Sequence, residues 1–308
     1  MDFNIMYQDF FKFTTLPFSL TPNPHFFCQL KGHQEALNTL EFCINSGEGF
    51  IKIIGEVGSG KTLLCRKMLE TLGEHYVSTY IPNPDLTPLE IRKAFARELG
   101  LNPTQWQDQH ELLTAIYQHL IELHRQNKKV ILIIDEAQAL SDESLETIRL
   151  LTNLETENTK LLQVALFAQP ELDQRLSQEK FRQLKQRISF SYSLPLMNRE
   201  DLETYLHHRL ATAGHTHGNL FTKKAKKLLF NASKGIPRIV NILSHKALLV
   251  AYGQGEQQIN HRAMKIAIKD TEITQQFKKR RLIKLTFITS MIIAGIALMI
   301  YLAGVIGP

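Results

Sequence analysis

Cysteine is scarce in this chain of 308 residues. Its three cysteines are Cys28, Cys43 and Cys65, and no two of them form a CxxC pair. The sequence therefore excludes a disulfide framework and a four-cysteine metal site. The first eleven residues also lack the basic start and apolar stretch of a secretory signal. We expect the N-terminal part of the chain to fold in a reducing cytosol.

Charge is absent from the end of the chain and uneven elsewhere. Residues 1–203 carry 20 basic and 27 acidic side chains, residues 204–277 carry 11 and 3, and residues 278–284 carry 5 and none. Residues 285–308 carry no charge. The overall net charge of +6 would favour nucleic acid or an anionic membrane as a partner. Its distribution instead indicates an acidic region over residues 1–203, a basic region over residues 204–277 and a short basic segment over residues 278–284.

The uncharged end contains one long apolar run. Residues 285–306 read LTFITSMIIAGIALMIYLAGVI, with only Thr, Ser and Tyr as polar members. A helix of this length spans about 33 Å, enough for a hydrocarbon core of about 30 Å. The alternative is a buried core helix. We predict a transmembrane helix at 285–306 and a basic juxtamembrane linker at 275–284, with the preceding residues on the cytoplasmic side.

Strand-like and helix-like segments alternate through the first two thirds of the chain. The strand-like runs are Phe50–Ile54, Tyr76–Ile81, Val130–Ile134, Leu161–Ala168 and Ile188–Leu194. This alternation predicts an α/β domain with a parallel five-stranded sheet over residues 1–197. Only helical patterns follow, at Arg199–Ala213, Thr222–Ala232, Pro237–Tyr252 and Asn260–Thr271. They predict a small all-α lid domain over residues 198–274.

A glycine-rich loop follows the first predicted strand. Residues 55–62 read GEVGSGKT, which fits the GxxxxGK[ST] pattern, and an amphipathic helix comes next. Such a loop presents backbone N–H groups and a helix N-terminus to phosphate oxygens, a lysine to the β- and γ-phosphates, and a hydroxyl to Mg²⁺. We therefore predict an ATP and Mg²⁺ site. The expected nucleotide-binding residues are Gly55, Glu56, Val57, Gly58, Ser59, Gly60, Lys61, Thr62 and Leu63.

Two acidic residues follow the most apolar strand. Asp135 is the expected second Mg²⁺ ligand, with Thr62, and Glu136 is the expected group that polarises the attacking water. The alternative is that both residues cap the helix starting near residue 142. The segment Asp135–Gln138 also resembles a helicase DEAD-type box, but such helicases need two sheet domains, and the sequence supplies strands for one.

Three further polar residues have positions that favour contact with a nucleotide. Gln169 ends the strand expected between the two nucleotide-binding strands, so it faces the γ-phosphate unless it is only a turn residue before Pro170. Arg187 precedes the last strand and is the expected arginine finger toward a neighbouring subunit, with Arg182 as the alternative. Arg238 opens a lid helix after Pro237 and points a cation toward the interdomain cleft. For each of these arginines, the alternative is a plain surface residue.

Six stretches together resemble AAA+ ATPases, and more narrowly the family of general secretion pathway protein A and the mannose-sensitive haemagglutinin (MSHA) pilus biogenesis ATPase MshM. They are residues 16–27, 48–51 leading into the loop, 132–138, 168–172, 182–188 and 235–241. The resemblance implies ATP hydrolysis with Mg²⁺ and ring or partial-ring assembly. It assigns Gln169 as sensor 1, Arg187 as the finger and Arg238 as sensor 2. It also places residues 21–27 near the adenine, with a proline-stiffened surface loop whose phenylalanines anchor in the core as the alternative. Ala168 departs from it, because the family usually has glycine there.

The expected function follows from the motifs, the apolar end and the resemblance. We expect a membrane-anchored ATPase of the bacterial inner membrane, with a cytoplasmic ATPase domain, that assists assembly of a type II secretion or type IV (MSHA-like) pilus system. Its expected partners are ATP, other copies of itself and membrane proteins of that machine, but not nucleic acid. The alternative is a DNA-binding AAA+ regulator of the transposition type, favoured by the basic lid. A small-molecule kinase is less well supported, because the sequence shows no second substrate site.

Overall fold

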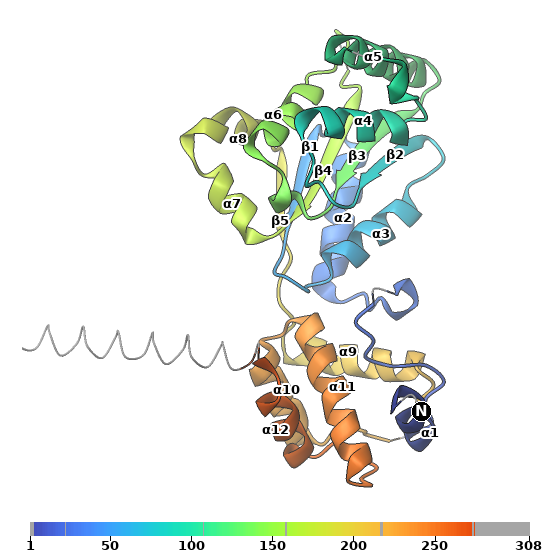
Figure 1. The fold of residues 1–308 in the computed structure, drawn as a ribbon, viewed down its shortest axis with the longest axis vertical. Coiled ribbons are helices and arrows are strands. Elements are labelled where there is room, and N and C mark those ends of the chain that lie inside the picture. The colour runs from blue at the N-terminus through green and yellow to red at the C-terminus, as the bar shows by residue number, and fades with distance from the viewer. Residues whose placement is uncertain are drawn as a thin grey trace, which may run out of the picture.

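The structure is a computed structural model that describes residues 3–21, 23–106, 108–157, 159–215, 218–272 and 274. A parallel sheet covered by helices forms one part, and a bundle of helices that includes the N-terminal helix forms the other (Figure 1). The segment after the N-terminal helix and the segment after the last strand connect the two parts (Figure 1). The predicted α/β fold with a five-stranded parallel sheet is confirmed.

The sheet has the strand order β2-β3-β4-β1-β5, and every neighbouring pair is parallel. Its strands are β1 (Phe50–Ile54), β2 (Tyr76–Ile81), β3 (Lys129–Ile134), β4 (Leu162–Ala168) and β5 (Phe190–Ser193). Strand β4 is buried along its whole length, and β3 is buried except at Lys129. Such apolar runs suit strands that are covered on both faces. All five strands lie where the sequence predicts them, within two residues at each end.

Helices cover the two faces of the sheet. They are α2 (Lys31–Asn45), α3 (Lys61–Thr71), α4 (Pro88–Glu98), α5 (Gln109–Arg125), α6 (Asp142–Leu151), α7 (Pro170–Leu176) and α8 (Arg182–Arg187), with 3₁₀ turns η1 (Pro24–Phe26), η2 (Pro103–Gln105), η3 (Ala137–Ala139) and η4 (Glu179–Phe181). Helices α2 and α3 pack on the face that carries Ile131 and Ile133. Helices α4, α5 and α6 pack on the face that carries Leu132 and Ile134. Successive β3 side chains thus alternate between two cores.

The second part is all helical. It comprises α9 (Arg199–Thr212), α10 (Lys223–Ser233), α11 (Pro237–Gly253) and α12 (His261–Lys269). The sequence predicts each of these helices. It does not predict α1 (Phe3–Phe11), α7 or α8. All three helices are short, so their stability depends on packing against distant parts of the chain rather than on a pattern within their own residues.

The N-terminal segment packs with this helical part rather than with the sheet. Tyr7, Phe11 and Phe18 are buried in one core with residues of α9 to α12. The Tyr7 hydroxyl lies 3.0 Å from Nδ1 of His245 on α11. The expectation that residues 1–197 form one domain assumes that segments adjacent in the sequence pack together. The structure instead shows that aromatic side chains before residue 30 share the core of the lid.

The membrane segment predicted from the sequence is not covered by the structure. Residues 275–284 and 285–306 both lie outside the described residues. Among the residues that the structure describes, no helix has both the length and the apolar character to cross a membrane.

Candidate nucleotide-binding site

The glycine-rich loop joins β1 to α3 and has a backbone that only glycine adopts readily. Gly58 has φ +77° and Gly60 has φ +101°, both in the left-handed region. A Cβ on Gly58 would lie 2.4 Å from Cβ of Arg238, so a side chain there would collide with the lid. The Arg238 backbone N–H donates to the Gly58 carbonyl oxygen over 3.1 Å. The loop and the start of α11 are therefore in direct contact.

Lys61 lies at the first turn of α3 and is only 4% exposed. Its Nζ donates to the carbonyl oxygens of Gly55 (2.8 Å) and Glu56 (3.1 Å). Burial lowers the pKa of Lys61, and the carboxylates of Glu136 and Asp135 oppose that effect. No side chain caps the N-terminus of α3. A buried ammonium beside an uncapped helix N-terminus is a favourable site for phosphate oxygens.

His33 of α2 supports the loop from inside the protein. Its Nε2 lies 3.1 Å from the Ser59 carbonyl oxygen, and a Cβ on Gly60 would lie 2.9 Å from the same nitrogen. Burial lowers the pKa of His33, so the neutral ring donates this hydrogen bond. The sequence alone does not identify His33, because no motif includes it and only the fold brings α2 against the loop.

Asp135 follows the buried end of β3 and is 1% exposed. Burial raises its pKa, while hydrogen bonds from the Thr62 side chain and the Glu136 backbone N–H lower it. The Thr62 hydroxyl and the Asp135 carboxylate are thus in contact, as predicted for two ligands of one metal ion. Hydroxyl and carboxylate oxygens suit Mg²⁺, so the residues present fit that ion.

Glu136 has left-handed backbone angles, φ 50° and ψ 37°, and its side chain turns toward the end of β4. Its Oε2 accepts a hydrogen bond from Nε2 of Gln169 over 2.9 Å and another from Nε2 of Gln138. The Gln169 backbone N–H donates to Oε1 of Gln138 over 3.0 Å. Strand β4 lies between β1 and β3, so Gln169 is next to both motifs, as its position in the sequence predicts.

The alternative that Asp135 and Glu136 cap helix α6 does not hold. The Ser141 hydroxyl accepts the backbone N–H of Ser144 and caps that helix. Neither carboxylate caps α6, and both lie close enough to Lys61 to oppose the lowering of its pKa.

A cleft lies between the loop and the lid. Its lining includes Lys61, Thr62, Glu136, Arg209, Arg238 and Asn241, together with Ser19, Leu20, Thr21 and Asn23 of the N-terminal segment. Arg238 thus lies in the interdomain cleft, as predicted, and part of the segment expected near the adenine also lines it.

Arg209 of α9 is a second lid cation in this cleft, and the sequence analysis missed it. It is 5% exposed, and its Nε donates to the Pro17 carbonyl oxygen over 2.6 Å. Its guanidinium carbon lies 4.5 Å from the centre of the Phe26 ring. Burial lowers the pKa of Arg209. Backbone carbonyls and an aromatic face stabilise the buried charge, and in doing so they fix the N-terminal segment against α9.

The two candidate finger residues do not line the cleft of their own chain. Arg187 is half-buried and Arg182 is exposed, and both belong to α8, just before the edge strand β5. This position on the rim of the sheet is compatible with contact to another subunit, which stays a prediction.

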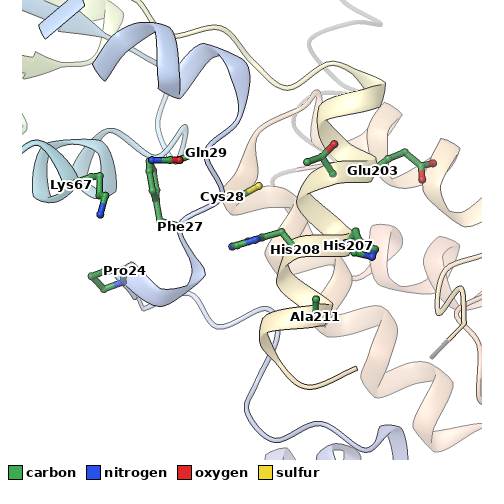
Figure 2. A pocket seen from close by; sticks show the side chains of 10 residues that line it. Pro24, Phe27, Cys28, Gln29, Lys67, Glu203, His207, His208 and Ala211 are labelled. Carbon is green, nitrogen blue, oxygen red and sulfur yellow. The ribbon is translucent and has the colours of Figure 1, made fainter. Parts of the chain in front are cut away.

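A second groove separates α3 from α9 (Figure 2). It is lined by Phe27, Cys28, Lys67, His207 and His208, among others. Within the described residues, no group of three or more metal-ligating side chains occurs. The groove also lacks the glycine-rich loop and both motif carboxylates. The cleft, rather than this groove, is therefore the candidate nucleotide site.

Comparisons with known proteins agree with this geometry. Residues 44–176 match the family described as AAA domain. General secretion pathway protein A of Aeromonas hydrophila is 39% identical over 262 residues, which are 85% of this chain and 48% of that protein. The chain thus spans about half the length of that relative.

Solved structures show the same fold at low sequence identity. The Aeropyrum pernix ORC2 protein has a TM-score of 0.58 at 18% identity, covering 81% of this chain and 72% of that one. Drosophila ORC bound to DNA has a TM-score of 0.60 at 16% identity, covering 87% and 65%. The Thermotoga maritima RuvB Holliday junction branch migration motor has a TM-score of 0.51 at 16% identity, covering 79% and 70%. These matches confirm the predicted resemblance: residues 44–176 match the AAA domain family, and most of the chain is similar to general secretion pathway protein A.

Proposed function

We propose that the chain binds ATP with Mg²⁺ in the cleft between loop and lid and hydrolyses it. The observation that carries this proposal is the convergence of Lys61, the pair Asp135 and Glu136, and Gln169 at one end of the sheet, from three separate segments. A buried lysine serves phosphate binding, and a carboxylate one residue beyond the metal ligand serves the activation of water.

Each residue has a separate part in the proposed reaction. Lys61 and the loop N–H groups bind the β- and γ-phosphates. Thr62 and Asp135 hold Mg²⁺, which neutralises charge on the phosphates. Glu136 orients the water that attacks the γ-phosphate, and the Gln169 amide contacts that phosphate. Arg238 reaches the nucleotide from α11, so closure of the lid and binding of ATP are linked.

We propose that the hydrolysis serves a membrane-bound assembly. The similarity to general secretion pathway protein A supports a role in a type II secretion or MSHA-like pilus system. The uncharged residues 285–306 after a basic run support a single-pass anchor in the bacterial inner membrane, with the ATPase part in the cytoplasm. We also infer a homo-oligomer, a ring or partial ring, in which Arg187 enters the cleft of a neighbour.

A DNA-binding regulator remains the second candidate because α10 carries Lys223, Lys224 and Lys227 on its exposed side. Cell fractionation separates the two candidates. The proposed function predicts that the full chain stays with membranes after a high-salt wash and needs detergent for release. A chain that is released without detergent and binds DNA with a steep salt dependence would favour the regulator.

Nucleotide binding is tested by Lys61→Ala with Lys67→Ala as the matched control. Lys67 lies on the same helix but is half-buried and pairs with Glu70. Equilibrium titration with ATP and Mg²⁺ should show at least about a hundredfold weaker binding for Lys61→Ala, because it removes a charged hydrogen-bond donor from the phosphates. Lys67→Ala should bind like the wild type. Equal affinity in all three proteins would overturn the assignment of the cleft.

A further inference from the structure

We propose that Gln138 is a positioning residue that sets where the Glu136 carboxylate lies when water attacks ATP. The inference rests on the proposed ATP hydrolysis and deepens it. Sequence patterns give Gln138 no role of its own. The structure places it in a ring of three hydrogen bonds with Glu136 and Gln169, and Gln138 takes part in two of them.

The three hydrogen bonds form a closed ring. The Gln138 amide nitrogen donates to Oε2 of Glu136, and the Gln169 amide nitrogen donates to the same oxygen over 2.9 Å. The Gln138 amide oxygen accepts the Gln169 backbone N–H over 3.0 Å. Gln138 thus contacts Glu136 and Gln169 at once, and the Glu136 carboxylate has two fixed donors on one oxygen.

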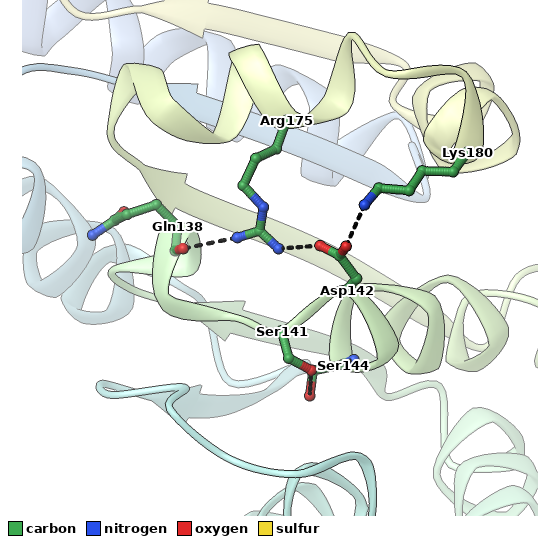
Figure 3. A network of polar contacts seen from close by, with 6 residues as sticks. All are labelled: Gln138, Ser141, Asp142, Ser144, Arg175 and Lys180. Atoms are coloured by element: carbon green, nitrogen blue, oxygen red, sulfur yellow. Dashed lines mark hydrogen bonds and ion pairs between the residues drawn. The ribbon is translucent and has the colours of Figure 1, made fainter.

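Gln138 is itself held in place by residues outside the site (Figure 3). Its backbone carbonyl oxygen accepts a hydrogen bond from Nη1 of Arg175 over 2.9 Å. Nη2 of Arg175 binds Oδ1 of Asp142 over 2.6 Å, and Asp142 also pairs with Lys180. The turn η3 is therefore tied to α6 and α7, so Gln138 presents its amide from a braced backbone rather than from a free loop.

The amide side chain of Gln138 meets two demands at this position. The side chain at this position needs a hydrogen-bond donor for the Glu136 carboxylate and an acceptor for the Gln169 backbone N–H. Both must lie on one terminal group at the end of a side chain as long as that of glutamine. A carboxylate in its place would repel Glu136. An apolar side chain would leave the Gln169 N–H without this acceptor and the carboxylate with one donor fewer.

The arrangement gives the two glutamines different parts during the reaction. The Gln169 amide is the donor that faces the γ-phosphate in the proposed function, so ATP competes with Glu136 for it. Neither glutamine is among the residues that line the cleft, but Gln169 follows β4, which lies between β1 and β3, whereas Gln138 lies on the turn η3 that Arg175 holds. When Gln169 turns to the phosphate, Gln138 remains as the donor that keeps the Glu136 carboxylate in place beside the water.

The test is the isosteric variant Gln138→Met, with Gln174→Met as the matched control on the exposed side of α7. Steady-state kinetics of the full chain in detergent should show kcat lower by about tenfold, which corresponds to one hydrogen bond to a charged group. The KM and the equilibrium affinity for ATP should stay within about twofold, since Gln138 does not touch the nucleotide. Gln174→Met should leave kcat unchanged.

A double-mutant cycle separates positioning from a structural effect. In a Glu136→Gln background, Gln138→Met should cause no further loss of kcat, because its effect passes through Glu136. Equal kcat for wild type and Gln138→Met, fully additive losses, or a parallel loss of ATP affinity would each overturn the positioning role. A wild type that binds ATP without hydrolysing it would instead overturn the proposed function beneath it. A Gln138→Glu variant, with a lower kcat than Gln138→Met at unchanged ATP affinity, would support repulsion of Glu136.

Discussion

Single residues in the cleft are tuned by burial. Lys61 and Asp135 are both almost fully buried, and burial lowers the pKa of the lysine and raises that of the aspartate. Both charged forms are therefore costly in the protein alone and gain stability from ligands of opposite charge. A site with these two residues is suited to a polyphosphate and a cation bound together, rather than to either one alone.

His33 gives the protein a pH dependence that can be measured. Its ordinary pKa of 6.5 is lowered by burial, so the folded protein holds the neutral ring while the unfolded chain takes up a proton as pH falls. This part of the stability is complete above about pH 7 and is lost as pH falls through about 6.5. We expect His33→Asn to show a smaller loss of unfolding free energy between about pH 7.5 and about pH 5.5 than the wild type. Chemical denaturation at the two pH values checks this, and an identical pH slope in both proteins would contradict it.

Motif residues could be predicted from sequence because each motif carries its own local geometry. Lys61, Thr62, Asp135, Glu136 and Gln169 all lie where their strands and loops predict. Their neighbours His33, Gln138 and Arg209 could not be assigned, because their contacts join segments that are far apart in the chain or depend on side-chain direction.

The helices and strands could be predicted where their apolar residues follow a clear pattern. The apolar strands and the long helices of the lid appear within about two residues of their expected ends. The N-terminal segment was not predictable in the same way. Its aromatic residues show a need for burial, but only the fold shows that they pack with the lid rather than with the sheet.

One turn between lid helices is sterically constrained. Gly235 has φ +77°, and a Cβ on it would lie 2.1 Å from the Met197 carbonyl oxygen, in the segment that joins the sheet to the lid. Gly255 has a similar φ of +68° but nothing within 4 Å of its Cβ position. We expect Gly255→Ala to cost about 1–2 kcal/mol of unfolding free energy from backbone strain alone, and Gly235→Ala to cost about 3 kcal/mol or more.

Urea denaturation of the two glycine variants measures the difference directly. Because the backbone strain is shared, the excess cost of Gly235→Ala reports the clash with Met197. Equal costs for the two variants would show that the lid and the connecting segment do not pack as described.

At the scale of the whole molecule, the charge is divided between the two ends of the chain. The net charge of +6 combines an acidic region over residues 1–203 with a basic region after it. Five of the basic residues fall within 278–284, directly before the uncharged run. The positive net charge is therefore a poor indicator of nucleic-acid binding and fits the proposed membrane anchor better.

The proposed contact between subunits can be tested by mixing two inactive variants. Arg187→Ala leaves the cleft intact, and Lys61→Ala leaves the finger intact, so a mixed oligomer contains clefts that are complete. We expect each variant alone to hydrolyse ATP poorly and their mixture to recover activity. The same mixture with Arg182→Ala in place of Arg187→Ala tests the alternative finger. No recovery with either arginine variant would contradict a finger supplied in trans by α8.

The central claim is that Glu136 activates water for the hydrolysis of ATP bound in the cleft. The most direct measurement compares ATP affinity and single-turnover hydrolysis in the wild type and Glu136→Gln. We expect the ATP affinity to stay within about twofold and hydrolysis to be slower by at least about a hundredfold, because the amide cannot accept the proton of the attacking water. Hydrolysis by Glu136→Gln at the rate of the wild type would contradict it.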